Sequence, residues 1–259
     1  MAHAAIVCEN LADAGTLTAS SAEALMPVSR LQDGHVGKRW RSTADPGYFT
    51  LDLAADVSLD TLGLFGLTLA STGSIRVRVS TAAGGATSGN VHDVTYTVAD
   101  EEMDLDYGAF VLPFASPVSA RYVRFDLADG AASYVEAGAV LAGLREAFTY
   151  NFVPGAGVTW NDRSRKSKTS GGQTLVFPDN KFRVVDFNLE WVTAAQRYGL
   201  HETIGRVNGT SAPVLLILDT DSDNLARDSI FGLIDAPAAA LYTNLVGIFA
   251  KAYRIEERG

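Results

Sequence analysis

The stretch Ile75-Arg76-Val77-Arg78-Val79 decides the fold class of the first half of this chain. Its aliphatic side chains face one side of an extended backbone and its arginines face the other, which is the period-two pattern of a half-buried β-strand. Similar runs occur at 48–53, 92–98, 109–112 and 121–127. Clusters of Gly, Asp, Ser and Pro separate these runs, so residues 1–145 predict an antiparallel all-β domain.

Several short motifs follow one another in this region. They are Leu31-Gln-Asp-Gly, Arg39-Trp40-Arg41-Ser42, the strand 48–53, the apolar run 59–65, the strand 75–80, Ala120 to Leu127 and Val135-Glu-Ala-Gly. In this order they resemble the discoidin, or coagulation-factor C-type, domain, a galactose-binding-like fold. The resemblance implies a jelly-roll β-sandwich that binds sugars or lipids with loops at one end and often holds a structural calcium. The chain departs from the family in lacking its cysteine pair and in the acidic insertion 100–106.

The resemblance also implies a candidate ligand edge. Its residues are Asp33, His35, Arg39 and Arg41. The alternative is that the Asp-Gly turn and Trp40 only fix this loop against the core. A sugar site also needs an exposed aromatic ring, for which Tyr48, Tyr107 and Tyr134 are the candidates.

Residues 146–259 predict a second β-rich domain. Strands are expected at 184–191, 213–218, 229–234 and 246–256. Thr193 is a plausible N-cap for one short helix over 193–207, which Gly199 and Gly205 weaken. The predicted fold class is therefore mainly β, with an N-terminal jelly-roll sandwich over 1–145 and a second β domain over 146–259.

The order of elements in this second half resembles small structural proteins of long-tailed bacteriophages. The resemblance implies a structural component of a tail tip or baseplate, made in the bacterial cytoplasm and located in the virion tail. Its expected partners are other tail proteins, copies of itself in a symmetric ring, and host surface glycans. The alternatives are a free-standing carbohydrate-binding protein and a module attached to a glycan-degrading enzyme.

A basic run lies in the polar loop expected at 161–173, before the first strand of the second half. It comprises Arg163, Arg165, Lys166 and Lys168 in a Ser- and Gly-rich context. We consider two interpretations, a solvated hairpin tip and an arm that docks onto a neighbouring subunit.

No pattern in the sequence predicts catalysis. The four histidines, His3, His35, His92 and His201, lack metal-ligand spacing, and no nucleophile elbow, P-loop or dinucleotide fingerprint is present. We therefore expect no enzymatic activity and no cofactor. The weak metal candidate is Asp219, Asp221 and Asp223, which start like a calcium loop but continue without its Gly and Glu, so that an Asx turn is the alternative.

Composition and charge limit the classes of protein to which the chain can belong. The chain is 47% hydrophobic and carries a net charge of −9, with 9 basic and 17 acidic residues through Arg145. Such an acidic surface disfavours nucleic-acid binding. Neither a signal peptide nor a membrane span is expected. The single cysteine, Cys8, cannot form an internal disulfide and is expected to be buried.

Overall fold

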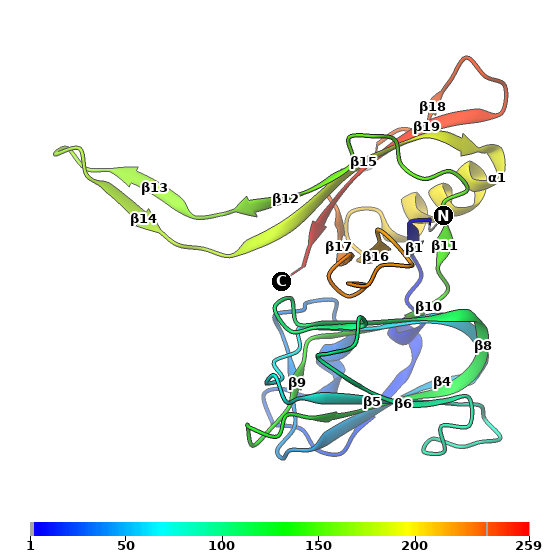
Figure 1. The fold of residues 1–259 in the computed structure, drawn as a ribbon, viewed down its shortest axis with the longest axis vertical. Coiled ribbons are helices and arrows are strands. Elements are labelled where there is room, and N and C mark those ends of the chain that lie inside the picture. Colours follow the sequence, from blue (N-terminus) through cyan, green and yellow to red (C-terminus); the bar gives the residue numbers. More distant parts are fainter. Residues whose placement is uncertain (1–2, 237, 259) are drawn as a thin grey trace.

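The computed structural model describes residues 3–236 and 238–258. Two β-rich bodies are stacked on one another, and a narrow arm projects from the upper one (Figure 1). The predicted fold class is confirmed: the chain is mainly β, with a jelly-roll sandwich followed by a second β-rich domain that carries one short helical segment.

Two long strands build the sandwich. The strands β4 (Gly47–Phe65) and β8 (Ala109–Ala128) pair with each other, and a register shift between Asp52 and Val57 bends them. Their outer halves, 47–52 of β4 and 122–128 of β8, join β2 and β5 in one layer. Their inner halves, 61–65 of β4 and 109–113 of β8, join β10 in the other layer, which lies next to the second body (Figure 1). The other elements are η1 (Leu11–Ala14), β2 (Thr16–Ala19), η2 (Val28–Gln32), β3 (Trp40–Arg41), β5 (Ser74–Ser80), β6 (His92–Thr97), β7 (Met103–Asp104), β9 (Glu136–Ala137) and β10 (Ala139–Gly143).

The predicted alternation supplies the sandwich core. Ile75, Val77 and Val79 are fully buried between the two layers. Trp40 is also fully buried, and its indole Nε1 donates a hydrogen bond to the Ser21 carbonyl at 3.0 Å. The Arg39-Trp40-Arg41-Ser42 segment is therefore anchored by its tryptophan, as an aromatic side chain with a satisfied polar edge should be.

The second domain is one antiparallel sheet in the order β11-β1-β16-β17-β19-β15-β12. Its first strand, β1 (Ala5–Val7), comes from the start of the chain and pairs with β16 (Val214–Ile217). Residues 5–7 thus lie in the second sheet and not in the sandwich, where a boundary at residue 145 alone would put them. The other strands are β11 (Glu146–Ala147), β12 (Gly157–Asp162), β15 (Lys181–Thr193), β17 (Ser229–Ile234), β18 (Leu241–Tyr242) and β19 (Ile248–Glu257).

An apolar interface joins the two bodies. The outer side of β10 and the inner halves of β4 and β8 pack against β1, β16 and β17. At its centre the rings of Phe65 and Phe231 stack at 4.5 Å, with an angle of 7° between their planes. Every residue of β10 is buried because one side faces the sandwich core and the other faces the second sheet. The bodies are therefore held together by a continuous core.

The helical segment begins at the predicted N-cap. The Thr193 hydroxyl accepts a hydrogen bond from the Gln196 amide at 3.3 Å, at the start of α1 (Ala194–Gln196). The chain continues in wider π-type turns, η3 (Arg197–His201) and η4 (Ile204–Asn208). Leu200 and Ile204 pack into the core on one face of the second sheet. This core also buries the thiol of Cys8, and burial raises its pKa to about 11.

A buried histidine in this core predicts an acid-sensitive stability. Burial, with a further contribution from Lys251, lowers the pKa of His201 from 6.5 to about 4, and its Nδ1 lies 2.6 Å from the Tyr253 hydroxyl oxygen. Between pH 6.5 and 4 the unfolded chain binds a proton that folded His201 does not bind. The free energy of unfolding is therefore expected to fall as the pH drops through this window, by at most about 3 kcal/mol from this group.

The measurement is denaturant unfolding at several pH values for the wild type and for His201→Gln. The glutamine cannot titrate, so the wild type should lose more stability than the variant on acidification. Parallel pH profiles for the two proteins would contradict the prediction.

Candidate functional site: the arm and the junction groove

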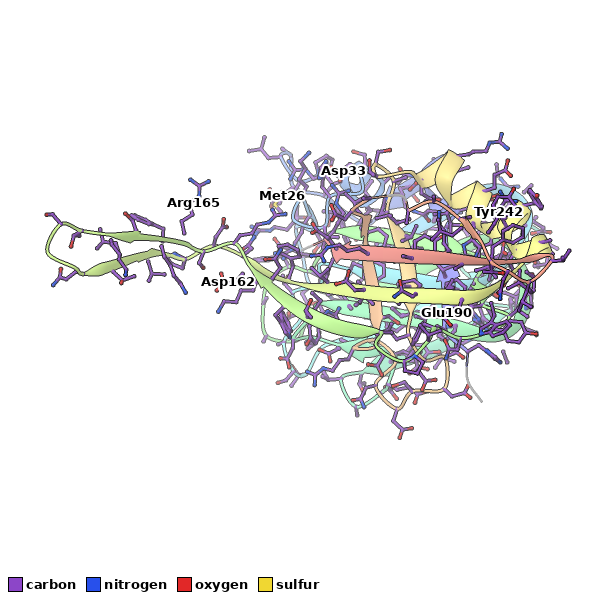
Figure 2. All side chains as sticks on the ribbon, turned by 90° about the horizontal axis from the view of Figure 1, so that it is seen from above. Met26, Asp33, Asp162, Arg165, Glu190 and Tyr242 are labelled. Carbon is purple, nitrogen blue, oxygen red and sulfur yellow. The ribbon has the colours of Figure 1, made fainter. Side chains whose placement is uncertain are left out.

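The arm is a two-stranded antiparallel hairpin, β13 (Arg165–Lys168) and β14 (Thr174–Phe177). It continues the β12–β15 pair beyond the edge of the sheet and extends far from both bodies (Figures 1 and 2). All residues of both strands are exposed to solvent.

The arm carries apolar side chains on both faces. Phe177 lies opposite Arg165 and Leu175 opposite Ser167, so that these four share one face. Val176 lies on the other face, opposite Lys166. Phe177 is 57% exposed, and Leu175 and Val176 are similarly open. An isolated hairpin is at best marginally stable in water, and among residues 3–236 and 238–258 nothing packs over these side chains enough to bury them.

The predicted basic run lies on this arm. Arg165, Lys166 and Lys168 belong to β13, and Arg163 stands at its base with its guanidinium 4.7 Å from the Phe182 ring centre. Of these, Figure 2 labels Arg165, whose side chain points into solvent. Residues 163–181 contain five basic residues and one acidic residue. The arm is therefore a basic, partly apolar surface.

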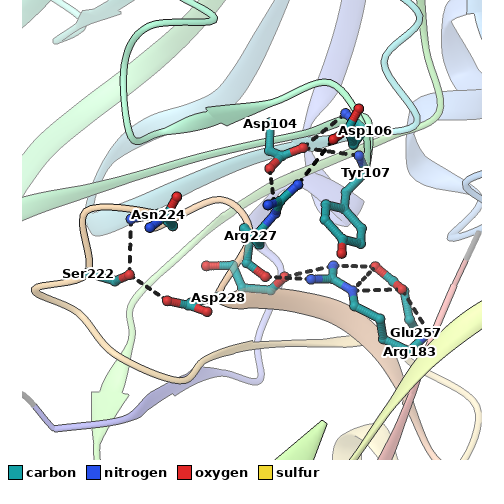
Figure 3. A network of polar contacts seen from close by, with 10 residues as sticks. Asp104, Asp106, Tyr107, Arg183, Ser222, Asn224, Arg227, Asp228 and Glu257 are labelled. Atoms are coloured by element: carbon teal, nitrogen blue, oxygen red, sulfur yellow. Dashed lines mark hydrogen bonds and ion pairs between the residues drawn. The ribbon is translucent and has the colours of Figure 1, made fainter. Parts of the chain in front are cut away.

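A buried ion pair anchors the base of the arm. Arg183 is only 4% exposed and pairs through its guanidinium with the Glu257 carboxylate. It also donates hydrogen bonds to the carbonyl oxygens of Arg227 and Ser229, at 2.5 and 3.2 Å (Figure 3). These bonds tie β15 to β17 and β19, so the strand that carries the arm is fixed to the sheet.

Tyr107 connects this network to the sandwich. Its ring lies under the guanidinium groups of Arg183 and Arg227, at 3.9 and 5.3 Å from the ring centre. Trp160 of β12 stacks beside the same ring at 6.0 Å. One tyrosine of the first body therefore contacts three elements of the second, as the close view in Figure 3 illustrates for the two arginines.

The acidic insertion of the sandwich has a structural role at this junction. Arg227 of the second domain pairs with Asp104 and Asp106 at 3.1 Å each. The amide of Ala226 donates a hydrogen bond to the Glu101 carbonyl at 2.9 Å. The insertion thus binds the loop between β16 and β17.

A groove of about 290 Å³ opens beside Tyr107, between the two bodies. Trp160, which is 58% exposed, forms one wall. The rest of the lining combines apolar residues with six charged side chains, namely Arg39, Lys181, Arg183, Glu257, Arg258 and Asp106. An open indole face beside hydrogen-bonding groups can stack a flat apolar ligand face while polar groups bind its hydroxyl or carboxylate groups.

The structure divides the predicted ligand edge into two clusters. Asp33 pairs with Lys38 and accepts a hydrogen bond from the His35 amide at 2.8 Å. His35 Nδ1 lies 3.2 Å from an Arg258 nitrogen, at the domain junction.

The second cluster surrounds the Glu136 carboxylate. Arg41 Nη2 lies 2.5 Å from it and Arg39 Nη1 lies 3.7 Å away. Arg39 also lines the junction groove, whereas Asp33, His35 and Arg41 do not. The structure thus brings Arg39 and Arg41 together at Glu136, and Asp33 next to His35 in the preceding turn.

Of the three tyrosines expected to offer a platform, Tyr107 lines the groove, under Arg183 and Arg227, whereas Tyr48 and Tyr134 pack against arginines outside the groove. The guanidinium of Arg124 lies 3.5 Å from the ring centre of Tyr48, and that of Arg41 lies 4.2 Å from the ring centre of Tyr134. The exposed ring at the groove is Trp160 instead. Its position in a strand of a polar, Gly-rich segment gave no signal for this role.

The acidic turn after β16 forms an Asx turn. The Asp219 carboxylate accepts a hydrogen bond from the Asp221 amide at 3.0 Å. Within residues 3–236 and 238–258, no group of three or more His, Cys, Asp or Glu side chains is placed to hold a metal ion, so Asp219, Asp221 and Asp223 do not converge. In the same part of the chain, no helix is long and apolar enough to span a membrane.

Comparison with known proteins finds similarity at the level of solved structures. No family model matches the chain, and no curated protein matches it. Chitosan-binding module 1 of a chitosanase/glucanase from Paenibacillus sp. IK-5 is 26% identical over 52% of this chain and 98% of that chain, with a TM-score of 0.40. Module 2 of the same enzyme, solved with chitotriose, is 22% identical over 52% and 99%, with a TM-score of 0.41.

A family 32 carbohydrate-binding module from C. perfringens, solved with galactose, is 15% identical over 54% of this chain and 99% of that chain, with a TM-score of 0.41. The similar structures are carbohydrate-binding modules. They cover about half of the chain.

Proposed function

We propose that this protein is a structural subunit that assembles into a multi-copy complex through its arm. The observation that carries the proposal is a projecting hairpin whose two faces both expose apolar side chains. Exposed apolar surface of this kind marks a protein–protein contact in stable proteins. Docking would bury Leu175, Val176 and Phe177 and supply the packing that a two-stranded hairpin lacks.

The finer form of this proposal is a component of a bacteriophage tail tip or baseplate. It is supported by the order of elements after residue 181, which runs from the alternating strand β15 through the short helical segment and the apolar strand β16 to the closing strand β19. In this assembly the sandwich would be a peripheral domain. The test is whether antibodies against the protein label the tail of virions encoded by the same genome; labelling of no virion structure would contradict it.

Removing the arm is the direct test of assembly. Residues 164–179 can be replaced by a short Gly-containing turn, because Arg163 and Asn180 are already joined by a backbone hydrogen bond of 3.3 Å. We expect the wild type to form oligomers and the shortened chain to remain monomeric in analytical ultracentrifugation. Thermal unfolding of the shortened chain should be unchanged, since the arm contributes nothing to the buried cores.

A milder variant, Leu175→Ser with Phe177→Ser, keeps the arm and its charge and should also weaken assembly. A wild type that stays monomeric at every accessible concentration, or a shortened chain that assembles as the wild type does, would refute the proposal.

A second candidate function, glycan binding, is favoured by the junction groove. Trp160 is 58% exposed and lines the groove together with Arg39 and Lys181, so a sugar ring could stack on the indole while its hydroxyl groups bind the charged side chains. Binding would be compatible with assembly and would place glycans between the two bodies.

A glycan array followed by calorimetry on the full chain tests this candidate. For any glycan that binds, Trp160→Ala should weaken affinity more than tenfold, about 1.4 kcal/mol. Trp191→Ala, at another exposed tryptophan outside the groove, is the matched control and should have no effect. Binding that survives Trp160→Ala would place the glycan elsewhere, and an array without any binding would reject this function.

A further inference from the structure

The charged side chains that line the junction groove do not balance one another. They are the cations Arg39, Lys181, Arg183 and Arg258 and the anions Asp106 and Glu257. Four cations and two anions give the lining an excess of positive charge, although the whole chain carries −9. A cleft lined by one sign of charge attracts a small ligand of the opposite sign.

Both anions of the lining are already paired within the protein (Figure 3). The Glu257 carboxylate pairs with the buried guanidinium of Arg183. The Asp106 carboxylate lies 3.1 Å from the guanidinium of Arg227. Neither anion is therefore available to neutralise the other three cations of the lining.

Arg39 is the first of these three cations, and it is only loosely paired. Its Nη1 lies 3.7 Å from the Glu136 carboxylate, which Arg41 already contacts at 2.5 Å. Within residues 3–236 and 238–258, its Nε has no hydrogen-bond partner. Since a guanidinium carries several N–H donors in a planar fork, Arg39 can still bind an anionic group.

Lys181 and Arg258 are the other two cations. In the part of the chain that the structure describes, no carboxylate oxygen lies within 4.0 Å of the charged nitrogens of either side chain. Asp162 lies opposite Lys181 in the β12–β15 pair, but its carboxylate accepts a hydrogen bond from the Ser164 amide at 2.8 Å. Arg258 contacts His35 Nδ1 at 3.2 Å, and a histidine supplies no negative charge.

Trp160 places an aromatic ring next to this positive charge. It lies opposite Arg183 in the β12–β15 pair, so that Trp160, Arg183 and Lys181 point to the same side of the sheet. Lys181 is the diagonal neighbour of Trp160, roughly 7–8 Å away in such a pair. A charged substituent of a sugar ring that stacks on the indole is therefore within reach of the lysine. The groove volume of about 290 Å³ suits a short stretch of a glycan.

We propose that the junction groove binds an acidic glycan, with a sugar ring stacked on Trp160 and its carboxylate or sulfate group paired with Lys181 and Arg39. This inference rests on the proposed glycan-binding function and names the class of glycan. The unpaired cations of the lining select an anionic sugar over a neutral one, because a neutral ring leaves their charge without a partner.

Matched oligosaccharides test this preference on the full chain. The probes are galactose and glucose oligosaccharides in three forms: neutral, with a carboxylate in place of the hydroxymethyl group, and with a sulfate on that group. In calorimetry we expect an acidic form to bind at least about tenfold more tightly than its neutral counterpart. Added NaCl should weaken the binding of the acidic form, and the comparison of carboxylate with sulfate identifies the group that the groove prefers.

Lys181→Gln removes one of the proposed partners of the acidic group. Lys181 is an exposed strand residue, so the variant should fold as the wild type does. Its affinity for the acidic form should fall by about tenfold, whereas its affinity for the neutral form should not change. Lys168→Gln is the matched control, since it removes an exposed lysine of the arm that lies outside the groove, and it should change neither affinity.

The outcomes separate this inference from the glycan-binding function. Equal affinity for the acidic and neutral forms would leave glycan binding in place and overturn only the acidic preference. Binding of the acidic form that survives both Trp160→Ala and Lys181→Gln would lie at another site and would also overturn the inference. A chain that binds no glycan in any form would reject the glycan-binding function itself.

Discussion

Arg183→Met is expected to lower the free energy of unfolding by about 3–5 kcal/mol, because it leaves the Glu257 carboxylate without its partner at a largely buried site. Arg183 also donates hydrogen bonds to the carbonyl oxygens of Arg227 and Ser229, and both would lose a donor. Methionine keeps most of the side-chain volume, so the loss reports on charge and hydrogen bonding. Urea unfolding followed by circular dichroism measures it.

Arg254→Met is the matched control. Arg254 pairs with Asp186 and Asp235 on the same sheet, at 3.2 and 3.3 Å, but all three side chains are about half exposed. An exposed pair of this kind contributes about 0–1 kcal/mol. Adding Glu257→Leu to Arg183→Met should recover part of the lost stability, because the unpaired charge is then removed. Equal effects of Arg183→Met and Arg254→Met would show that burial of the ion pair is not what stabilises the junction.

Trp40→Ala is expected to cost about 3–5 kcal/mol of unfolding free energy, the range for removing a large buried aromatic side chain. Trp40 is fully buried and packs edge-on against Phe49, with 5.5 Å between the ring centres. The substitution leaves a cavity in the sandwich core and also removes the hydrogen bond to the Ser21 carbonyl. Calorimetric unfolding should show a lower transition temperature for the sandwich.

Trp191→Ala is the control here, since Trp191 is about half exposed on the outer side of β15 and its loss should cost well below 1 kcal/mol. A Trp40→Ala protein as stable as the Trp191→Ala protein would mean that the anchoring role of the first tryptophan is wrong.

The local patterns of the sequence predicted many of the strands, but not β1 or the strands β12, β13 and β14 that lead into and form the arm. The alternation at 75–79 identified three side chains that are fully buried, and Thr193 is the N-cap that its hydroxyl and position predicted. The basic run at 163–168 was recognised, with a hairpin tip and an inter-subunit arm left as alternatives. Such features depend on residues within one strand or one turn. The alternation of a strand and the capping residue of a helix can therefore be identified from neighbouring positions in the sequence.

The contacts that build the candidate sites depend on residues far apart in the chain. Pairing of Ile6 with Leu216 places the first strand in the second sheet, and contact between Tyr107 and Trp160 forms the wall of the groove. No local pattern in the sequence predicts which distant residues pair in this way. The sequence by itself determined the β class, the sandwich and the basic run. Only the tertiary structure decided how far the arm projects and that its apolar side chains stay exposed, because the burial of a side chain depends on which distant segments pack over it.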